Sequence, residues 1–107
     1  MIELSEGAPM AEFQKYIYEL EAFHGWLDVD LVHNCFLMGE EVGELFKAVR
    51  RHEKYFENPT KEENTKAEVA EEIVDVFNYL LAIANRLDID LEDAFRKKNK
   101  RNQERTW

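Results

Sequence analysis

Apolar residues recur along most of the chain at the three- and four-residue spacing of an α-helix. The first run covers residues 10–23 and is followed by Gly25, a residue typical of a helix C-terminus. The second begins near Asp28 or Asp30, either of which can cap it, and extends to about Arg51. Neither run has the alternation of a β-strand, so the pattern predicts two helices here.

Residues 52–64 form a polar segment interrupted by Pro59, and this segment is predicted to be a loop. Within it, Thr60 and Glu63 have the spacing of a capping box. A third helix is therefore predicted to begin at Thr60 and to extend to about Leu87.

Asp90 and Asp93 begin a fourth predicted helix, which ends in a basic tail. No internal repeat and no low-complexity tract interrupts the pattern. Four helices with short links predict an all-α protein of the four-helix-bundle type, in one domain over residues 1–107.

Several apolar faces exceed what one small chain can cover. From Val76 to Ala84 the third helix is apolar nearly all round, apart from Asn78, so it is expected to be buried on every side. Gly39 and Gly43 lie four residues apart, where small residues allow another helix to approach closely. The expected core face of the third helix comprises Ala70, Ile73, Phe77, Leu80 and Ala84. These features predict a homo-oligomer.

Composition and charge exclude several classes of protein. Hydrophobic residues make up 45% of the chain, too many for a disordered protein. No apolar run approaches a membrane span, and the N-terminus does not have the pattern of a signal peptide. Cys35 is alone, which fits a reducing compartment, so a cytoplasmic location is expected. The net charge of −9 argues against nucleic-acid binding.

Two predicted helices carry acidic residues within otherwise apolar or small-residue lines. One line includes Glu41 and Glu44, and the other includes Glu72 and Asp75. If the two helices pack antiparallel with these lines together, four carboxylates converge and repel one another. A hard divalent cation resolves the repulsion, and oxygen-only ligands favour Mg²⁺, with Mn²⁺ as a substitute.

Other interpretations of the acidic lines stay open. Acidic residues at helical spacing commonly form a solvated face, and the chain is then a non-catalytic oligomeric scaffold or regulatory protein. A di-iron site is disfavoured, because none of the three histidines follows a glutamate by three residues.

The two acidic motifs in order, Glu40-Glu41-x-x-Glu44 and Glu72-x-x-Asp75, resemble those of the MazG-like all-α NTP pyrophosphatase superfamily. The resemblance extends from about Gly25 to the end of the chain. It implies a homodimer or a dimer of dimers. The implied activity is Mg²⁺-dependent hydrolysis of ribo- or deoxyribonucleoside triphosphates to the monophosphate and pyrophosphate, with nucleotide-pool sanitising as the favoured task. Phosphoribosyl-ATP relatives are a less natural match, because the chain has the Gly-Trp pair and tail of the MazG-like branch.

Carried over residue by residue, the resemblance implies specific roles. The implied metal ligands are Glu41, Glu44, Glu72 and Asp75, with Glu40 as an accessory acid. Glu40 or Glu44 is the candidate to accept the proton of the attacking water. The implied substrate contacts are Tyr79, Lys98, Asn102 and Arg105. Trp26, more than Trp107, is a candidate to stack on the base.

Overall fold

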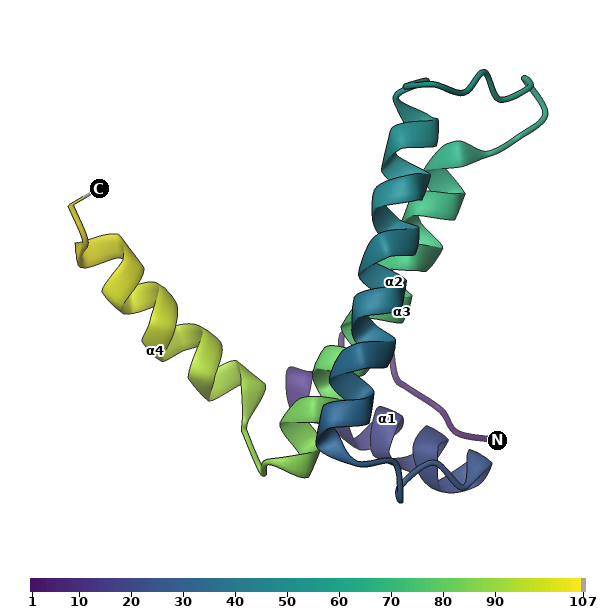
Figure 1. Cartoon of the computed structure of the whole chain (residues 1–107). Helices are drawn as coiled ribbons and strands as arrows, with labels where there is room; N and C mark the ends of the chain where they lie inside the picture. The colour runs from purple at the N-terminus through teal and green to yellow at the C-terminus, as the bar shows by residue number, and fades with distance from the viewer. Residues whose placement is uncertain (107) are drawn as a thin grey trace. The chain divides into compact units, whose positions relative to one another are not determined.

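In the computed structural model, residues 1–106 are described and contain four α-helices and no strand (Figure 1). Trp107 lies outside the described residues. The helices are α1 (Met10–His24), α2 (Leu31–His52), α3 (Thr65–Arg86) and α4 (Leu91–Glu104). The prediction of an all-α fold with four helices is confirmed. In the described part of the chain, none of the helices has the length and apolar character required to cross a membrane.

Three predicted helix ends are confirmed by their capping geometry. Gly25 follows α1 in the left-handed conformation, with φ of 74°, which a residue without a Cβ adopts at no steric cost. The Asp30 side chain caps α2 by accepting a hydrogen bond from the His33 N–H at 2.8 Å. Asp90 caps α4 in the same way, through the Asp93 N–H at 3.1 Å.

The predicted start of the third helix is wrong. Thr60 and Glu63 form one of the two capping-box bonds, since the Thr60 N–H donates to the Glu63 carboxylate at 3.2 Å, while the Glu63 N–H donates to the Thr60 carbonyl. They close only a turn, however, and α3 begins at Thr65. Asn64 is the residue whose side chain accepts from the first turn, through the Ala67 N–H at 3.0 Å. The Glu63 carboxylate is instead paired with Arg51 of α2, so tertiary contact overrides the local signal.

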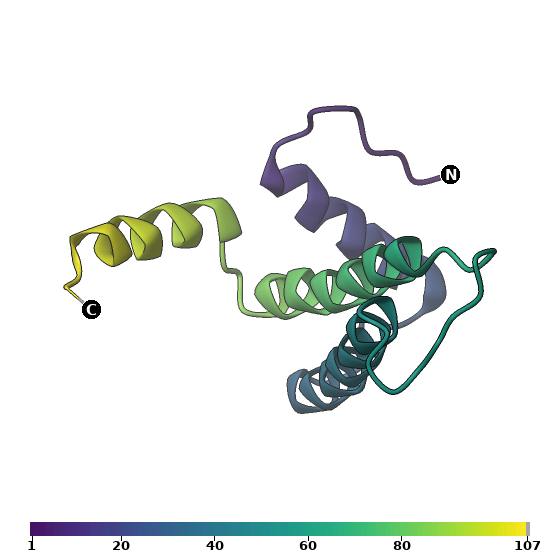
Figure 2. The same ribbon diagram turned by 90° about the horizontal axis from the view of Figure 1, so that it is seen from above.

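The chain divides into two compact units, described separately below. The first, residues 30–80, contains α2 and most of α3. These helices lie side by side and antiparallel, joined by residues 53–64 (Figures 1 and 2). At the joined end, His52 Nδ1 lies 2.8 Å from Thr65 Oγ1. Arg51 forms ion pairs with three carboxylates, which tie the connection to both helices: Glu57, Glu63 and Glu68.

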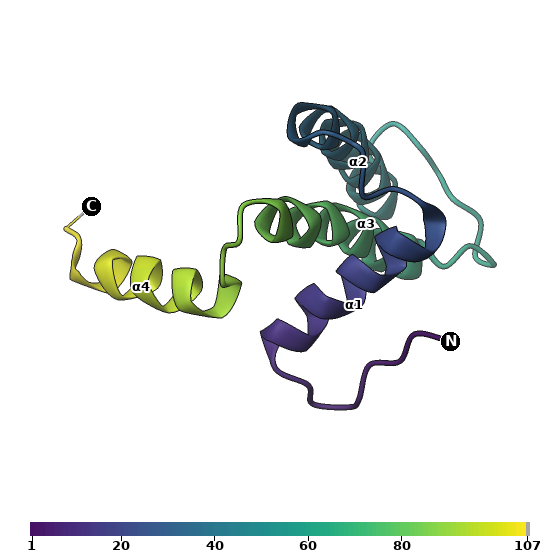
Figure 3. The ribbon, with the colours of Figure 1, turned by 90° about the horizontal axis from the view of Figure 1, so that it is seen from below.

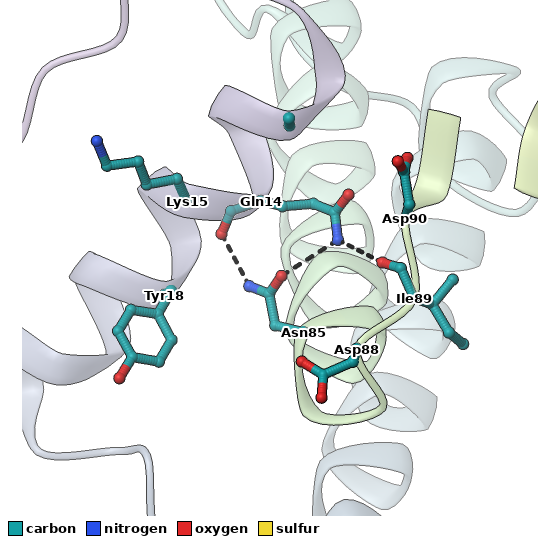
Figure 4. A pocket seen from close by; sticks show the side chains of 8 residues that line it. Gln14, Lys15, Tyr18, Asn85, Asp88, Ile89 and Asp90 are labelled. Atoms are coloured by element: carbon teal, nitrogen blue, oxygen red, sulfur yellow. Dashed lines mark hydrogen bonds between the residues drawn. The ribbon is translucent and has the colours of Figure 1, made fainter. Parts of the chain in front are cut away.

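The second unit joins residues 1–29 to the chain from residue 81 onward. Here α1 lies beside the end of α3 (Figure 3). The Gln14 amide donates to the Asn85 side chain at 3.2 Å and to the Ile89 carbonyl at 2.8 Å, and its oxygen accepts from the Leu91 N–H at 3.1 Å. A shallow hollow of about 470 Å³ lies beside this network (Figure 4). The Gln14 and Asn85 amides on its wall are already hydrogen-bonded within the fold.

Among the described residues, few side chains are buried. The buried hydrophobic residues are Ile17, Ala48, Leu81, Ala82 and Ala84. Leu80 is 44% exposed and Ile73 is 52% exposed in the single chain, so burial of α3 on every side would need a second copy and stays a prediction. Likewise, a Cβ placed on Gly39 or Gly43 meets no atom of the described residues within 4 Å, so the pairing of α2 with α3 leaves these positions open. The predicted homo-oligomer stays a prediction.

Candidate metal and active site

The acidic lines of α2 and α3 meet within the unit of residues 30–80. Glu41, Glu72 and Asp75 each contribute one carboxylate oxygen to a group in which all oxygens lie within 4.8 Å of one another. The antiparallel pairing produces this meeting, because it places the middle of α2 opposite the middle of α3. Glu72 and Asp75 are three residues apart, so both reach the same side of α3. These three are called the acidic cluster below.

The electrostatics of the acidic cluster disfavour full ionisation. Burial raises the pKa of the Glu41 carboxyl, and the nearby charges of Asp75 and Glu72 raise that pKa further. Glu44, one turn along α2, adds to the same effect. Because neighbouring negative charges raise the pKa of the Glu41 carboxyl, a cation bound among these carboxylates relieves their repulsion and is stabilised there.

The cluster fits a hard divalent cation. Glu72 and Glu41 are partly shielded from solvent, while Asp75 is exposed. The Glu72 Oε2 atom is buried and has no hydrogen-bond partner in the described structure, which is a costly arrangement for a carboxylate oxygen. Mg²⁺ binds a few carboxylates and retains water or phosphate oxygens in its other positions. Three carboxylate ligands, one with an unpartnered buried oxygen, suit that coordination.

The other predicted acids lie close by but outside the cluster. Glu44 is exposed, and its influence on the pKa of Glu41 places it near the cluster. Glu40 is also exposed, on the adjacent position of α2. Tyr79 lies one turn beyond Asp75 on α3 and is partly buried. The structure thus brings together three of the four predicted ligands.

The remaining predicted substrate contacts belong to the other unit. Trp26 follows Gly25 and is 51% exposed. Lys98 is exposed on α4, where Asn102 donates to the Asn99 side chain at 3.1 Å. Arg105 is the residue at the C-terminal cap of α4. All four are described within their own unit, so their predicted roles stay predictions.

Sequence reasoning missed three polar residues that the fold buries or pairs. Asn34 is 3% exposed and lies seven residues before Glu41, which places it on the same face of α2. The helical spacing between Asn34 and Glu41 was the sequence signal that could have indicated this position. Glu21 is 7% exposed and pairs with Arg86, 65 residues away, a contact for which helical spacing carries no signal. Glu68, on the acidic line of α3, pairs with Arg51.

Comparisons with known proteins identify the family of the chain. Residues 10–102 match the model of the phosphoribosyl-ATP pyrophosphohydrolase family, which is most of the chain. The chain belongs to this family. It is also 30% identical over 92 residues to the uncharacterized protein YvdC of Bacillus subtilis (strain 168), covering 81% of this chain and 86% of that protein.

Membership confirms the resemblance to the all-α pyrophosphatase superfamily and identifies the chain as a pyrophosphohydrolase of that type. The matching family carries the name of the phosphoribosyl-ATP branch, which the sequence motifs had favoured less. The Gly25-Trp26 pair and the basic tail are therefore not sufficient to assign the chain to the other branch.

Proposed function

We propose that this pyrophosphohydrolase hydrolyses a nucleoside triphosphate to the monophosphate and pyrophosphate and requires Mg²⁺. The observation that carries the proposal is the acidic cluster, in which Glu41, Glu72 and Asp75 place three oxygens within 4.8 Å of one another. A cluster of unneutralised carboxylates repels a polyphosphate, so the substrate must bind together with cations. Glu44 becomes the fourth ligand through a change of its exposed side chain. Mn²⁺ is expected to substitute.

In the proposed reaction, water attacks the α-phosphorus, the bond from that phosphorus to the bridging oxygen breaks, and pyrophosphate leaves. Glu40 is positioned on α2 beside Glu41, is exposed, and accepts the proton of the water. Bound Mg²⁺ supplies the positive charge that neutralises the phosphates and the charge developing on pyrophosphate.

The substrate contacts in this proposal are those that the family resemblance implies. Tyr79 contacts the nucleotide one turn from the cluster, and Trp26 offers a half-exposed indole to the base. Lys98, Asn102 and Arg105 approach the phosphates. Removal of non-standard nucleotides from the cellular pool is the task that this chemistry fits.

A substrate panel tests the proposal. Purified protein is incubated with ribo- and deoxyribonucleoside triphosphates and with phosphoribosyl-ATP, in Mg²⁺, Mn²⁺ or EDTA, and pyrophosphate and monophosphate are measured. We expect equal molar release of both products from a triphosphate with either metal and none with EDTA. If only phosphoribosyl-ATP is turned over, that compound replaces the nucleoside triphosphate as the proposed substrate. No turnover of any compound would favour the scaffold interpretation.

We further propose that a second copy of the chain covers the exposed apolar face of α2. This face contains Gly39 and Gly43, around which the described residues leave open space, flanked by exposed side chains. Val32 is 62% exposed, Phe36 is 72% exposed and Phe46 is 68% exposed. A face of this kind, apolar and with room for a second backbone, suits a self-complementary dimer contact.

Replacing Phe36 with Asp is expected to shift the protein from dimer to monomer at micromolar concentration, because the charge is buried in the contact without a partner. Sedimentation velocity measures the change. The control is Phe56→Asp, because Phe56 is 84% exposed in the loop between α2 and α3. If both variants sediment like the wild type, the α2 face is not the contact.

A further inference from the structure

Arg86, the last residue of α3, contacts the segment that connects α1 to α2. Its Nε donates to the Val29 carbonyl at 3.0 Å, and Nη2 donates to the Trp26 carbonyl at 3.1 Å. The same side chain donates to Ala82 of its own helix at 3.3 Å. One guanidinium therefore holds two carbonyls of a six-residue connection, residues 25–30.

The guanidinium is itself fixed by a carboxylate of α1. Nη2 lies 2.8 Å from Glu21 Oε2, and Nη1 donates to Glu21 Oε1 at 3.2 Å, so the pair is bidentate. The Glu21 side chain is 9% exposed and that of Arg86 is 16% exposed. A shielded, bidentate pair of this kind has one preferred geometry, and removal of either partner leaves a buried charge unpaired.

The connection presents Trp26 in a defined orientation. The Trp26 N–H donates to the Glu21 carbonyl at 2.8 Å, and its carbonyl also accepts from the Val29 N–H at 3.1 Å. The indole stacks on the His24 ring, with centroids 4.3 Å apart and planes at 19°, while half of the residue stays exposed. Backbone and ring are thus both held, and the exposed part of the indole is available to a planar ligand.

We infer that Arg86, held by its ion pair with Glu21, is a positioning residue that fixes the orientation of Trp26 for contact with the nucleotide base. The inference rests on the proposed function and adds a specificity determinant outside the acidic cluster. Arginine is required because contact with the bidentate carboxylate and with two separate carbonyls needs a planar, forked set of donors. Lysine keeps the charge but has a single nitrogen.

The first test is a double-mutant cycle with the nucleotide that the panel identifies. Trp26→Ala is expected to raise KM about 10-fold with kcat within about two-fold, since loss of stacking on the base weakens binding but leaves the reacting groups in place. Arg86→Lys is also expected to raise KM. The double variant should be no worse than Trp26→Ala alone, because both act through one contact. Glu21→Gln should also raise KM, but by a smaller factor.

A matched control is Arg51→Lys, because Arg51 also pairs with several carboxylates but does so between α2 and α3. It should lower the melting temperature without changing KM. Additive KM effects of Arg86→Lys and Trp26→Ala, or a KM unchanged by Trp26→Ala, would overturn the inference while leaving the proposed function intact.

A second readout does not depend on turnover. In a Trp107→Phe background, which leaves Trp26 as the single tryptophan, acrylamide quenching reports the exposure of the indole. Arg86→Lys should increase quenching without any nucleotide, and Arg51→Lys should leave it unchanged. Equal quenching in all three proteins, with folding checked by circular dichroism, would overturn the inference even if no nucleotide is turned over.

Discussion

Replacement of Glu72 with Gln should reduce Mg²⁺-dependent pyrophosphate release by about 1,000-fold or more in kcat/KM. Glu72 is the residue of the acidic cluster whose Oε2 is buried without a hydrogen-bond partner. Gln keeps the size of the side chain but removes the negative charge and one of the two acceptor oxygens. Loss of a charged metal ligand removes several kcal/mol of transition-state stabilisation, and each 1.36 kcal/mol is a factor of ten.

The neighbouring Glu71 provides a matched control. Glu71 lies on the same helix, one residue earlier, and is exposed. Successive helix residues point about 100° apart, so Glu71→Gln removes an identical charge from a different face. Steady-state kinetics of the two variants should differ by about the full 1,000-fold effect. Comparable losses in both would show that general negative charge, and not ligation at Glu72, supports the activity.

The central geometry of the site followed from sequence because it depends on local periodicity. The spacings Glu41 to Glu44 and Glu72 to Asp75 fix which residues share a helix face. Whether the two lines face each other was an assumption at the sequence level; in the structure α2 and α3 pair antiparallel, which brings Glu41 to Glu72 and Asp75. Glu44 stays outside the group of three, because periodicity fixes a face of the helix and not a side-chain rotamer.

The start of the third helix was predicted wrongly, and what covers its apolar face could not be predicted, for a different physical reason. Thr60 and Glu63 make one of the two bonds of a capping box, yet the Glu63 carboxylate also pairs with Arg51 and the helix begins at Thr65. Ile73 and Leu80 have the spacing of a core face but are about half exposed in this chain. Apolar periodicity predicts that a face will be covered, but it does not say whether the cover is the same chain or another copy.

The pairing of Glu21 with Arg86 could not have been predicted from spacing. The two residues are 65 positions apart, and their contact depends on how α1 meets the end of α3. In a single sequence, a lone acidic residue on a mostly apolar helix line is a weak signal. Its burial to 7% exposure becomes informative only in the folded structure.

Replacement of Glu41 with Gln should have opposite effects on stability without and with metal. In metal-free buffer at pH 8, we expect the melting temperature to rise by about 2–5 °C, because the variant removes a charge that burial, Asp75 and Glu72 all disfavour. In wild type, Mg²⁺ at about 100 times its Kd should add about 2.7 kcal/mol, or roughly 10 °C. In the variant that increase should largely disappear.

The pH dependence separates this explanation from a general packing effect. The pKa of Glu41 is higher in the folded protein than its ordinary value of 4.5, so the folded state binds the proton more tightly than the unfolded state. This contribution to the free energy of unfolding is therefore fully present below pH 4.5 and is lost as the pH rises through the folded pKa. The stability difference between Glu41→Gln and wild type should be small below pH 4.5, grow across that window and then stay constant.

Thermal melts in EDTA from pH 4 to pH 8, with the exposed Glu40→Gln variant as the control, measure this difference directly. A difference independent of pH would mean that Gln simply packs better at this position. A difference that grows with pH and reverses when Mg²⁺ is added would have one physical cause. The carboxylates that destabilise the metal-free protein would be the same ones that bind the cation, so the cost in stability and the metal affinity would arise from one cluster.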